Sequence, residues 1–276
     1  MLTVAVDDIT DERLLPYTKL TDMQLRARIE PEEGIFLAEG EMVILRALAA
    51  GFEPISAFME PKWLPGLESE LTRYECPVFL ADEAVLKAVT GYRLHRGALA
   101  AFSRKPLPLV ADVLAGARFV IVLENLVDHT NVGLIFRSAA GLGADAVLVS
   151  PQCADPLYRR SVKVSMGAVL TTPWTRAEPW PWILEDLANQ GFERVALTPS
   201  AAAANLRTWS PRSDEGRVAL LLGSEGPGLS DDVFTRVDTL LRIPMTERVD
   251  SLNVAAAAAI ACYALAAGNA QANLAQ

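Results

Sequence analysis

The chain has 276 residues, of which 51% are hydrophobic, and a formal net charge of −9. This length allows two domains, or one large α/β unit with an appendage, and the acidic balance argues against a protein that coats nucleic acid nonspecifically. Three widely separated cysteines and only two histidines argue against a disulfide framework, a zinc site and a catalytic metal.

The N-terminal part of the chain mixes helical and strand signals. Its opening is acidic and does not have the charged-then-apolar pattern of a leader, which predicts a soluble cytoplasmic protein. Residues 41–50 predict a helix ended by Gly51, and residues 77–80 predict a short strand. Between them, Pro61, Pro65 and Gly66 predict a loop.

A boundary between two domains is predicted near residue 106. Residues 94–102 are typical of a strand in which Gly97 allows close backbone approach. The proline-containing stretch 103–109 then has the composition of a semi-rigid linker. We therefore predict domains at 1–106 and 107–276.

After this linker, strands and helices alternate, which is typical of a largely parallel sheet. The expected strands are 118–123, 146–150, 194–198, 218–222 and 239–243. The expected helices are 131–141, 157–164, 182–190 ended by Gly191, a short one after residue 230, and 254–267.

The last helix consists almost entirely of small or apolar residues. Its fourteen residues, 254–267, are fewer than the roughly 18 that a membrane span needs, so we expect a helix buried on most sides. Ser251, Leu252 and Asn253 precede it, where side chains can bond the free N–H groups of the first turn. A ligand edge could be bound there.

The first candidate site segment is NLVDHTNVGLIFR (125–137), which follows a strand where open α/β sheets bind ligands. Asn131 is expected to cap the helix. Arg137 is expected to reach over Gly133, which has no side chain, and to direct its guanidinium toward the mouth of the site. A guanidinium can hold a phosphate through two hydrogen bonds. An arginine on a solvated helix face would explain the same residue.

The second segment is GSEGPGLS (223–230), whose three glycines allow a ligand to approach the backbone closely. It does not match the usual phosphate-binding patterns, and Glu225 would repel a phosphate. A neutral or cationic ligand resembling a nucleoside fits better. A glycine-rich turn is the simpler explanation of this segment by itself.

The third segment, 243–253, joins the last strand to the last helix. The apolar Ile243, Met245 and Leu252 are placed to wall a slot, and Ser251 and Asn253 to supply hydrogen bonds. A capped core helix is again the simpler explanation of the segment taken alone.

Basic residues gather in two stretches that contain no acid, 84–111 and 156–177. On an acidic body, such stretches would suit phosphate contacts at chosen places, although ordinary solvated charge is the alternative. The candidate phosphate-contact residues are Arg93, Arg96, Arg104, Lys105, Arg159, Arg160 and Lys163.

Together, NVGLIFR, LLLGSEGPGLS and IPMTERVDSLNVAAA resemble, in this order, the three motifs of the SpoU/TrmH family of RNA 2′-O-ribose methyltransferases, in the SPOUT class. The resemblance covers residues 118–268, and KVSMGAVLTTP (163–173) looks like the segment between the first two motifs. FLAEGEMVILRAL and LHRGALAAF resemble, more weakly, parts of the family's substrate-binding domain.

The resemblance implies an α/β fold with a deep trefoil knot, preceded by a smaller α/β domain that binds the RNA substrate. It also implies S-adenosylmethionine as the cofactor, a homodimer with its active site completed across the interface, and no metal or membrane. An N-terminal domain of this size is more similar to ribosomal-RNA-directed members than to the minimal transfer-RNA ones, so ribosomal RNA is favoured.

Residue roles follow from the same resemblance. The residues near the cofactor would be Gly223, Ile243, Leu252, Met245 and Asn253. Arg137 matches the family's catalytic arginine, and the other matches near the reacting centre are Asn131, Glu225, Ser251 and Asn253. The chain departs from many members by carrying Ala255 where they have serine. We expect changed packing there and retained activity.

Other readings stay open at this stage: a transfer-RNA 2′-O-methyltransferase, a non-catalytic RNA-binding factor that retains the fold, or an α/β enzyme that uses another nucleotide cofactor. Asn131, Arg137, Glu225 and Asn253 argue against loss of catalysis, and the missing phosphate-binding patterns argue against the last alternative.

Overall fold

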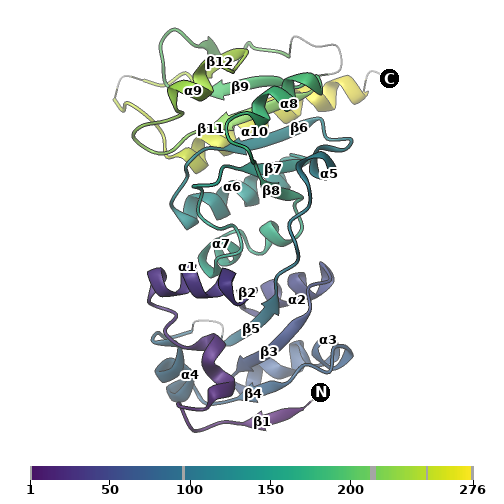
Figure 1. Cartoon of the computed structure of the whole chain (residues 1–276), viewed down its shortest axis with the longest axis vertical. Coiled ribbons are helices and arrows are strands. Elements are labelled where there is room, and N and C mark those ends of the chain that lie inside the picture. The colour runs from purple at the N-terminus through teal and green to yellow at the C-terminus, as the bar shows by residue number, and fades with distance from the viewer. Residues whose placement is uncertain (1, 95–96, 212–215, 247, 275–276) are drawn as a thin grey trace. The chain divides into compact units, whose positions relative to one another are not determined.

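The computed structural model describes residues 2–94, 97–211, 216–246 and 248–274, the last nine of them as backbone alone. The chain forms two compact units, which are described separately (Figure 1). The first comprises Met1–Pro106 and Asp155–Thr171, and the second comprises Leu107–Ala154 and Thr172–Gln276. Within the described ranges, no helix is both long and apolar enough to cross a membrane.

The first unit contains a five-stranded sheet with the strand order β1-β4-β3-β5-β2. Strand β5 runs antiparallel to β2 and β3, and the other pairs are parallel. The two faces are apolar and covered by helices, so nearly every residue of β2 and β5 is buried. The strands are β1 (Thr3–Ala5), β2 (Ile35–Glu39), β3 (Pro54–Met59), β4 (Val78–Leu80) and β5 (Ala98–Ser103).

The helices of this unit follow local sequence signals. Helix α2 (Glu41–Ala49) ends as predicted, with Gly51 in the left-handed region at φ +72°. Residues 61–66, expected as a loop, form a 3₁₀ helix. The remaining helices are η1 (Glu12–Tyr17), α1 (Met23–Glu32), η2 (Pro61–Gly66), α3 (Glu68–Arg73), α4 (Glu83–Thr90), α7 (Arg159–Val164) and η3 (Ala168–Leu170).

Residues 155–171 were expected in the domain 107–276, but in the structure they pack with the first unit. The reason is a set of contacts that no sequence pattern shows. Asp155 forms an ion pair with Arg104 at 2.6 Å, and α7 lies against β2. The break between Pro106 and Leu107, in contrast, falls inside the predicted linker.

The second unit contains a seven-stranded, entirely parallel sheet with the order β10-β12-β9-β11-β6-β7-β8. Its central strands are continuous apolar runs, as expected where helices cover both faces. The strands are β6 (Phe119–Leu123), β7 (Ala146–Val149), β8 (Trp174–Arg176), β9 (Glu193–Leu197), β10 (Ala204–Asn205), β11 (Val218–Leu222) and β12 (Thr239–Arg242).

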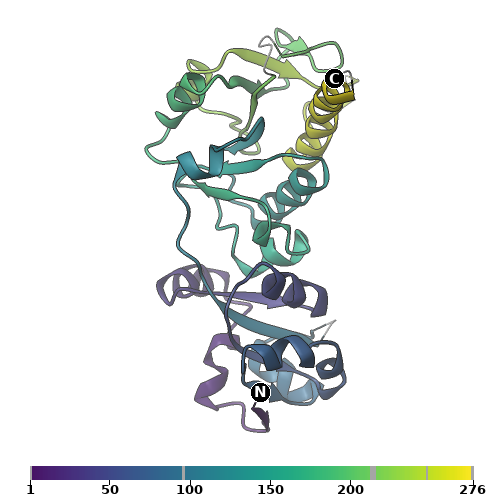
Figure 2. The ribbon, with the colours of Figure 1, turned by 90° about the vertical axis from the view of Figure 1, so that its right-hand side faces the viewer.

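Helices α5, α8 and α9 contribute to the core on one face of this sheet. Helices α6 and α10 pack against each other on the other side (Figure 2). The helices are α5 (Val110–Leu114), α6 (His129–Gly141), α8 (Ile183–Asn189), α9 (Asp231–Phe234) and α10 (Val254–Leu274). The strands and helices that were predicted for this unit all exist, with ends shifted by a few residues, but β8, β10 and α5 were not predicted.

Helix α10 differs from its prediction in two respects. It continues to Leu274, beyond the expected end at residue 267. It was expected to be buried on most sides, yet Ile260 is 43% exposed and Tyr263 70% exposed. Because Ala256, Ile260 and Tyr263 recur at helical spacing, they form one exposed face.

Candidate active site

A cavity of about 510 Å³ lies in the second unit at the carboxyl ends of three neighbouring strands. Open parallel sheets bind their ligands at this edge, because the loops that follow the strands converge there. The loops after β9, β11 and β12 and the first turn of α10 form its wall. All five predicted cofactor-site residues line it: Gly223, Ile243, Met245, Leu252 and Asn253.

The glycine-rich loop has a conformation that other residues would not permit. A Cβ atom at Gly223 would lie 2.2 Å from the carbonyl carbon of Gly228, so only glycine fits there. Gly226 and Gly228 have φ values of +86° and +76°. Two backbone hydrogen bonds between Ser224 and Gly228 close the loop, at 3.2 and 3.0 Å. The backbone thus forms a narrow cradle along one wall of the cavity.

Three polar residues from distant parts of the chain meet at this cavity. The Asn253 amide nitrogen donates to Glu225 Oε1 at 2.6 Å and to Asn131 Oδ1 at 2.9 Å. The Asn131 amide nitrogen donates to the same oxygen of Glu225 at 3.2 Å. The structure therefore brings together three of the five residues that were expected near the reacting centre, one from each motif.

The prediction that Asn131 caps its helix is wrong. Asp128 is the cap of α6, and its carboxylate accepts from the backbone N–H groups of Thr130 and Asn131 at 2.5 and 3.0 Å. The helix consequently begins two residues earlier, at His129. Asn131 lies in its first turn, so its side chain is free to bond Glu225 and Asn253.

Arg137 lies exposed on α6, two turns after Asn131, and lines a separate hollow of about 610 Å³. Gly133, one turn earlier, is buried, and the predicted passage of the Arg137 side chain over it stays a prediction. Asn253 lines both this hollow and the cavity. Ser251 lines the cavity but is not among the residues of the hollow. Asn253 is thus part of the lining of both the hollow at Arg137 and the candidate cofactor site.

Some cavity residues were missed in the sequence. Thr198 and Pro199 follow β9, and Leu197 is its last residue. The available signal was their position after a predicted strand, at the same edge of the sheet as the glycine-rich loop. Within the described ranges, no group of three or more His, Cys, Asp or Glu residues could hold a metal ion.

Comparison with known proteins shows the family to which the chain belongs. Residues 118–263 match the model of the SpoU rRNA methylase family. An uncharacterized tRNA/rRNA methyltransferase of Mycobacterium tuberculosis is 44% identical over 258 residues, which cover 94% of this chain and 90% of that protein. The chain belongs to the SpoU family. It is accordingly an RNA methyltransferase.

Two further proteins of known name are similar to the chain. The 23S rRNA (guanosine-2′-O-)-methyltransferase RlmB of Ralstonia nicotianae is 29% identical over 187 residues, which cover 66% of this chain and 74% of that protein. A solved structure of an RNA 2′-O ribose methyltransferase is 27% identical, with a TM-score of 0.75 over 98% of this chain and all of that one. The mixed α/β fold of the chain also matches the solved structure of the SpoU methyltransferase AviRb from Streptomyces viridochromogenes, with a TM-score of 0.75 at 23% identity over 94% of this chain and 98% of that one.

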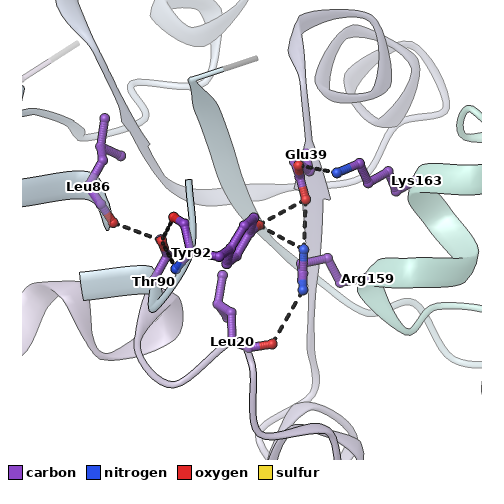
Figure 3. A network of polar contacts seen from close by, with 7 residues as sticks. All are labelled: Leu20, Glu39, Leu86, Thr90, Tyr92, Arg159 and Lys163. Atoms are coloured by element: carbon purple, nitrogen blue, oxygen red, sulfur yellow. Dashed lines mark hydrogen bonds and ion pairs between the residues drawn. The ribbon is translucent and has the colours of Figure 1, made fainter. Parts of the chain in front are cut away.

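Several of the residues that were expected to contact RNA form ion pairs with acids of the same unit. Arg159 is only 16% exposed, and its Nη1 atom lies 2.7 Å from both Glu39 Oε2 and Tyr92 Oη (Figure 3). Lys163, 44% exposed, pairs with the other oxygen of Glu39 at 2.5 Å. Burial alone would raise the pKa of Glu39, but the hydrogen bond and charge of Lys163 and the charge of Arg159 outweigh it, so this pKa is lowered.

Arg104 is also turned inward. It pairs with Asp155 at 2.6 Å, is 16% exposed, and donates through Nε to the Ile35 carbonyl at 2.6 Å. The prediction of a basic surface is therefore wrong for Arg104 and Arg159, because acids that are distant in sequence lie beside them. Arg93, Lys105, Arg160 and Lys163 have exposed side chains. Arg96 lies outside the described residues.

Replacing Asn253 by aspartate tests the polar network. In the native chain the Asn253 Oδ1 accepts from the Ala255 N–H at 3.0 Å, and aspartate keeps this acceptor. The substitution replaces the amide nitrogen that donates to Glu225 by a carboxylate oxygen, so two carboxylates then face each other. Because like charges repel and a hydrogen bond is lost, we expect the free energy of unfolding to fall by about 1–3 kcal/mol. Urea unfolding would measure it. The control is Asn205→Asp, since the Asn205 oxygen accepts Arg207 N–H in the same way. Equal losses in the two variants would contradict the network.

Proposed function

We propose that the chain transfers a methyl group from S-adenosylmethionine to a ribose 2′-hydroxyl of RNA. The observation that carries this proposal is the cavity at the carboxyl edge of the sheet, where one polar residue from each motif joins a single hydrogen-bonded network. Relatives whose names specify 2′-O-methylation support the choice of acceptor atom.

The cavity suits S-adenosylmethionine in shape and charge. Its glycine cradle presents backbone groups at close range, as the adenosine part of a cofactor requires. Glu225 contributes a carboxylate at the rim, which favours a cationic ligand over a phosphate. When bound, this cofactor supplies a methyl group already activated by its sulfonium. A solved rRNA methyltransferase of Sinorhizobium meliloti, with a TM-score of 0.79, contains bound AdoMet.

We assign the cofactor-contacting role to Gly223, Ile243, Met245, Leu252 and Asn253, because all five line the cavity. A 2′-hydroxyl is a weak nucleophile, so the remaining task of the site is to position it and remove its proton. Arg137 is the candidate for this task, with Asn131, Glu225, Ser251 and Asn253 holding the surrounding groups. Arginine is a poor base by itself, so we propose that a neighbouring RNA phosphate assists it.

Ribosomal RNA is the proposed substrate class, with transfer RNA as the alternative. The 29% identical relative is named for 23S rRNA, and the 44% identical relative for tRNA/rRNA. We propose that the first unit binds this RNA and that the exposed Arg93, Lys105, Arg160 and Lys163 contact its phosphates. We also propose that the enzyme acts in the cytoplasm.

The deciding experiment incubates the purified protein with methyl-labelled S-adenosylmethionine and, separately, ribosomal and transfer RNA that lack the modification. Nuclease digestion then maps the label. Label on a ribose 2′-oxygen of one RNA is expected and would name the substrate. Label on a base would contradict the proposal. Cofactor binding that is absent altogether would favour a non-catalytic RNA-binding factor with the same fold.

We further propose that the loop between β12 and α10 is part of a deep trefoil knot. Two features support it. The loop after β11 and the segment after β12 line the same cavity, and α10, which follows them, returns to pack against α6. This path would thread the C-terminal segment through an earlier loop, as in the family's known fold.

A homodimer is proposed on the exposed face of α10. Ile260 and Tyr263 are 43% and 70% exposed, and Leu134 of the adjoining α6 is 37% exposed. Aromatic side chains in apolar patches are frequent anchors of interfaces. The Arg137 hollow lies between these same two helices, so a second copy seated there would border the active site.

The variant Tyr263→Glu tests the dimer. A charge at this position would have to be desolvated in the interface, so we expect the dimer dissociation constant to rise at least about 30-fold, corresponding to about 2 kcal/mol. Light scattering after size exclusion separates a dimer from the 29.8 kDa monomer. The control is Leu15→Glu, since Leu15 is similarly exposed but lies in the first unit. A monomeric native protein, or dissociation by both variants, would contradict this interface.

A further inference from the structure

Glu124 is a buried carboxylate immediately after β6, only 2% exposed. It accepts three hydrogen bonds. Its Oε2 accepts from the backbone N–H of Ser230 at 2.7 Å, and its Oε1 accepts from the Ser230 hydroxyl at 2.7 Å and from the Trp180 indole N–H at 3.1 Å. Burying a carboxylate destabilises a fold unless hydrogen-bond donors surround it. The three donors around Glu124 satisfy this requirement and hold the carboxylate in place.

The same residue holds both ends of the glycine-rich loop 223–230. Its backbone N–H donates to the carbonyl of Leu222, the residue before the loop, at 2.9 Å. Its side chain holds Ser230, the last residue of the loop. Between these two points the loop is closed on itself by the Ser224–Gly228 pair. The loop can therefore shift relative to β6 only if contacts of Glu124 break.

Ser230 extends the connection to the next helix. Its hydroxyl oxygen accepts from the Val233 N–H at 3.4 Å and caps α9. One carboxylate thus ties together β6, the loop and α9. Glu124 itself does not line the cavity, whereas the loop residues from Gly223 to Gly226, and Gly228, do. Any effect of Glu124 on a ligand must pass through the loop.

We propose that Glu124 is a positioning residue of the cofactor site, which fixes the glycine-rich loop in the conformation that receives S-adenosylmethionine. The proposal rests on the proposed function for the identity of the ligand. We call the contacts of Glu124 with Leu222 and Ser230 the Glu124 clamp. The clamp is a property of the chain alone and does not depend on the identity of the ligand. The loop is pre-organised by Glu124, so binding need not bear the entropy of ordering it.

The test is Glu124→Gln, which keeps the size of the side chain. A glutamine has one acceptor oxygen and an amide group that donates, so it cannot accept from both Ser230 N–H and Trp180 N–H. We expect hydrogen exchange of the amides in 223–230 to become faster without any ligand. We also expect the Kd and the KM for S-adenosylmethionine to rise about tenfold, as when one buried charged hydrogen bond is lost, while kcat at saturating cofactor and the KM for RNA stay near native values.

A matched control separates positioning from general destabilisation. Glu193 is a carboxylate of the same unit, 7% exposed, which accepts from Thr239 Oγ1 at 2.6 Å at the opposite end of the sheet. Glu193→Gln replaces a charged acceptor by a neutral one at this distant position, so whatever its effect on the Tm, it should leave cofactor affinity and loop exchange unchanged. Unchanged loop exchange in Glu124→Gln, or an equal loss of affinity in both variants, would overturn the clamp. A native protein that binds no S-adenosylmethionine would instead overturn the proposed function, while the exchange result would still decide the clamp.

Discussion

Replacing Arg137 by alanine is expected to reduce methyl transfer at least about 100-fold, the range of one lost proton-transfer group, while S-adenosylmethionine binds as before. The reason is geometric. Arg137 lines the hollow beside α10 and not the cofactor cavity, and the two sites share Asn253. Single-turnover transfer to the RNA identified by labelling would measure the first quantity, and calorimetry with S-adenosylmethionine the second.

Two comparisons make this expectation decisive. Arg73→Ala removes an arginine that is 71% exposed on α3 of the first unit and pairs with the nearby Glu70, so the variant should transfer methyl groups at the native rate. Arg137→Lys retains the charge but not the planar pair of donors, and should recover little activity. Native turnover in Arg137→Ala would refute the assignment of this residue. A lost cofactor affinity would mean that Arg137 supports the cavity instead.

Replacing Arg26 by methionine is expected to lower the free energy of unfolding by about 3–5 kcal/mol, the largest stability change predicted for this chain. Arg26 and Glu30 are 3% and 1% exposed, and Nε lies 3.0 Å from Glu30 Oε1. Arg26 also donates to the Pro16 carbonyl at 2.8 Å. Its removal leaves a buried carboxylate without its partner. Urea unfolding would measure the loss.

The loss should depend on pH in a defined direction. Burial raises the pKa of Glu30 above its ordinary value despite the opposing charge of Arg26. An acid whose pKa is higher in the folded state stabilises the fold when it is protonated, and destabilises it when it is ionised. In Arg26→Met the pKa rises further, so the deficit should shrink from about pH 7.5 to about pH 5. The double variant Arg26→Met/Glu30→Met should be nearly as stable as the native chain, because no charge remains unpaired. A deficit that is the same at both pH values would refute the role of Glu30.

Much of the secondary structure was readable from local patterns. The apolar runs at 119–123 and 218–222 form the buried central strands, because a parallel sheet covered on both faces needs apolar residues throughout. The position of Gly51 after α2 was equally clear, since a helix commonly ends at a left-handed glycine. The cap of α6 was misread, because Asp128 and Asn131 are both good capping residues and only the observed helix start distinguishes them.

The candidate site was predicted as a set of segments and not as an arrangement. Motif order identified Asn131, Glu225 and Asn253, but their mutual hydrogen bonds link residues up to 122 positions apart. Glu124 gave no signal of its own, because its partners Trp180 and Ser230 lie 56 and 106 positions away in the sequence. Hydrogen bonding over such separations depends on the topology of the sheet.

Local sequence patterns were sufficient to predict the family, the succession of strands and helices, and the residue types available at the carboxyl edge of the sheet. These are properties of short segments, in which composition and spacing act directly on the backbone. Which basic side chains lie beside an acid depends instead on the tertiary structure. Arg104 and Arg159 lie in stretches without acids, yet the fold places Asp155 and Glu39 beside them, because buried guanidinium groups require partners. Tertiary structure likewise left one face of α10 exposed, since burial depends on what packs against a helix and not on its composition alone.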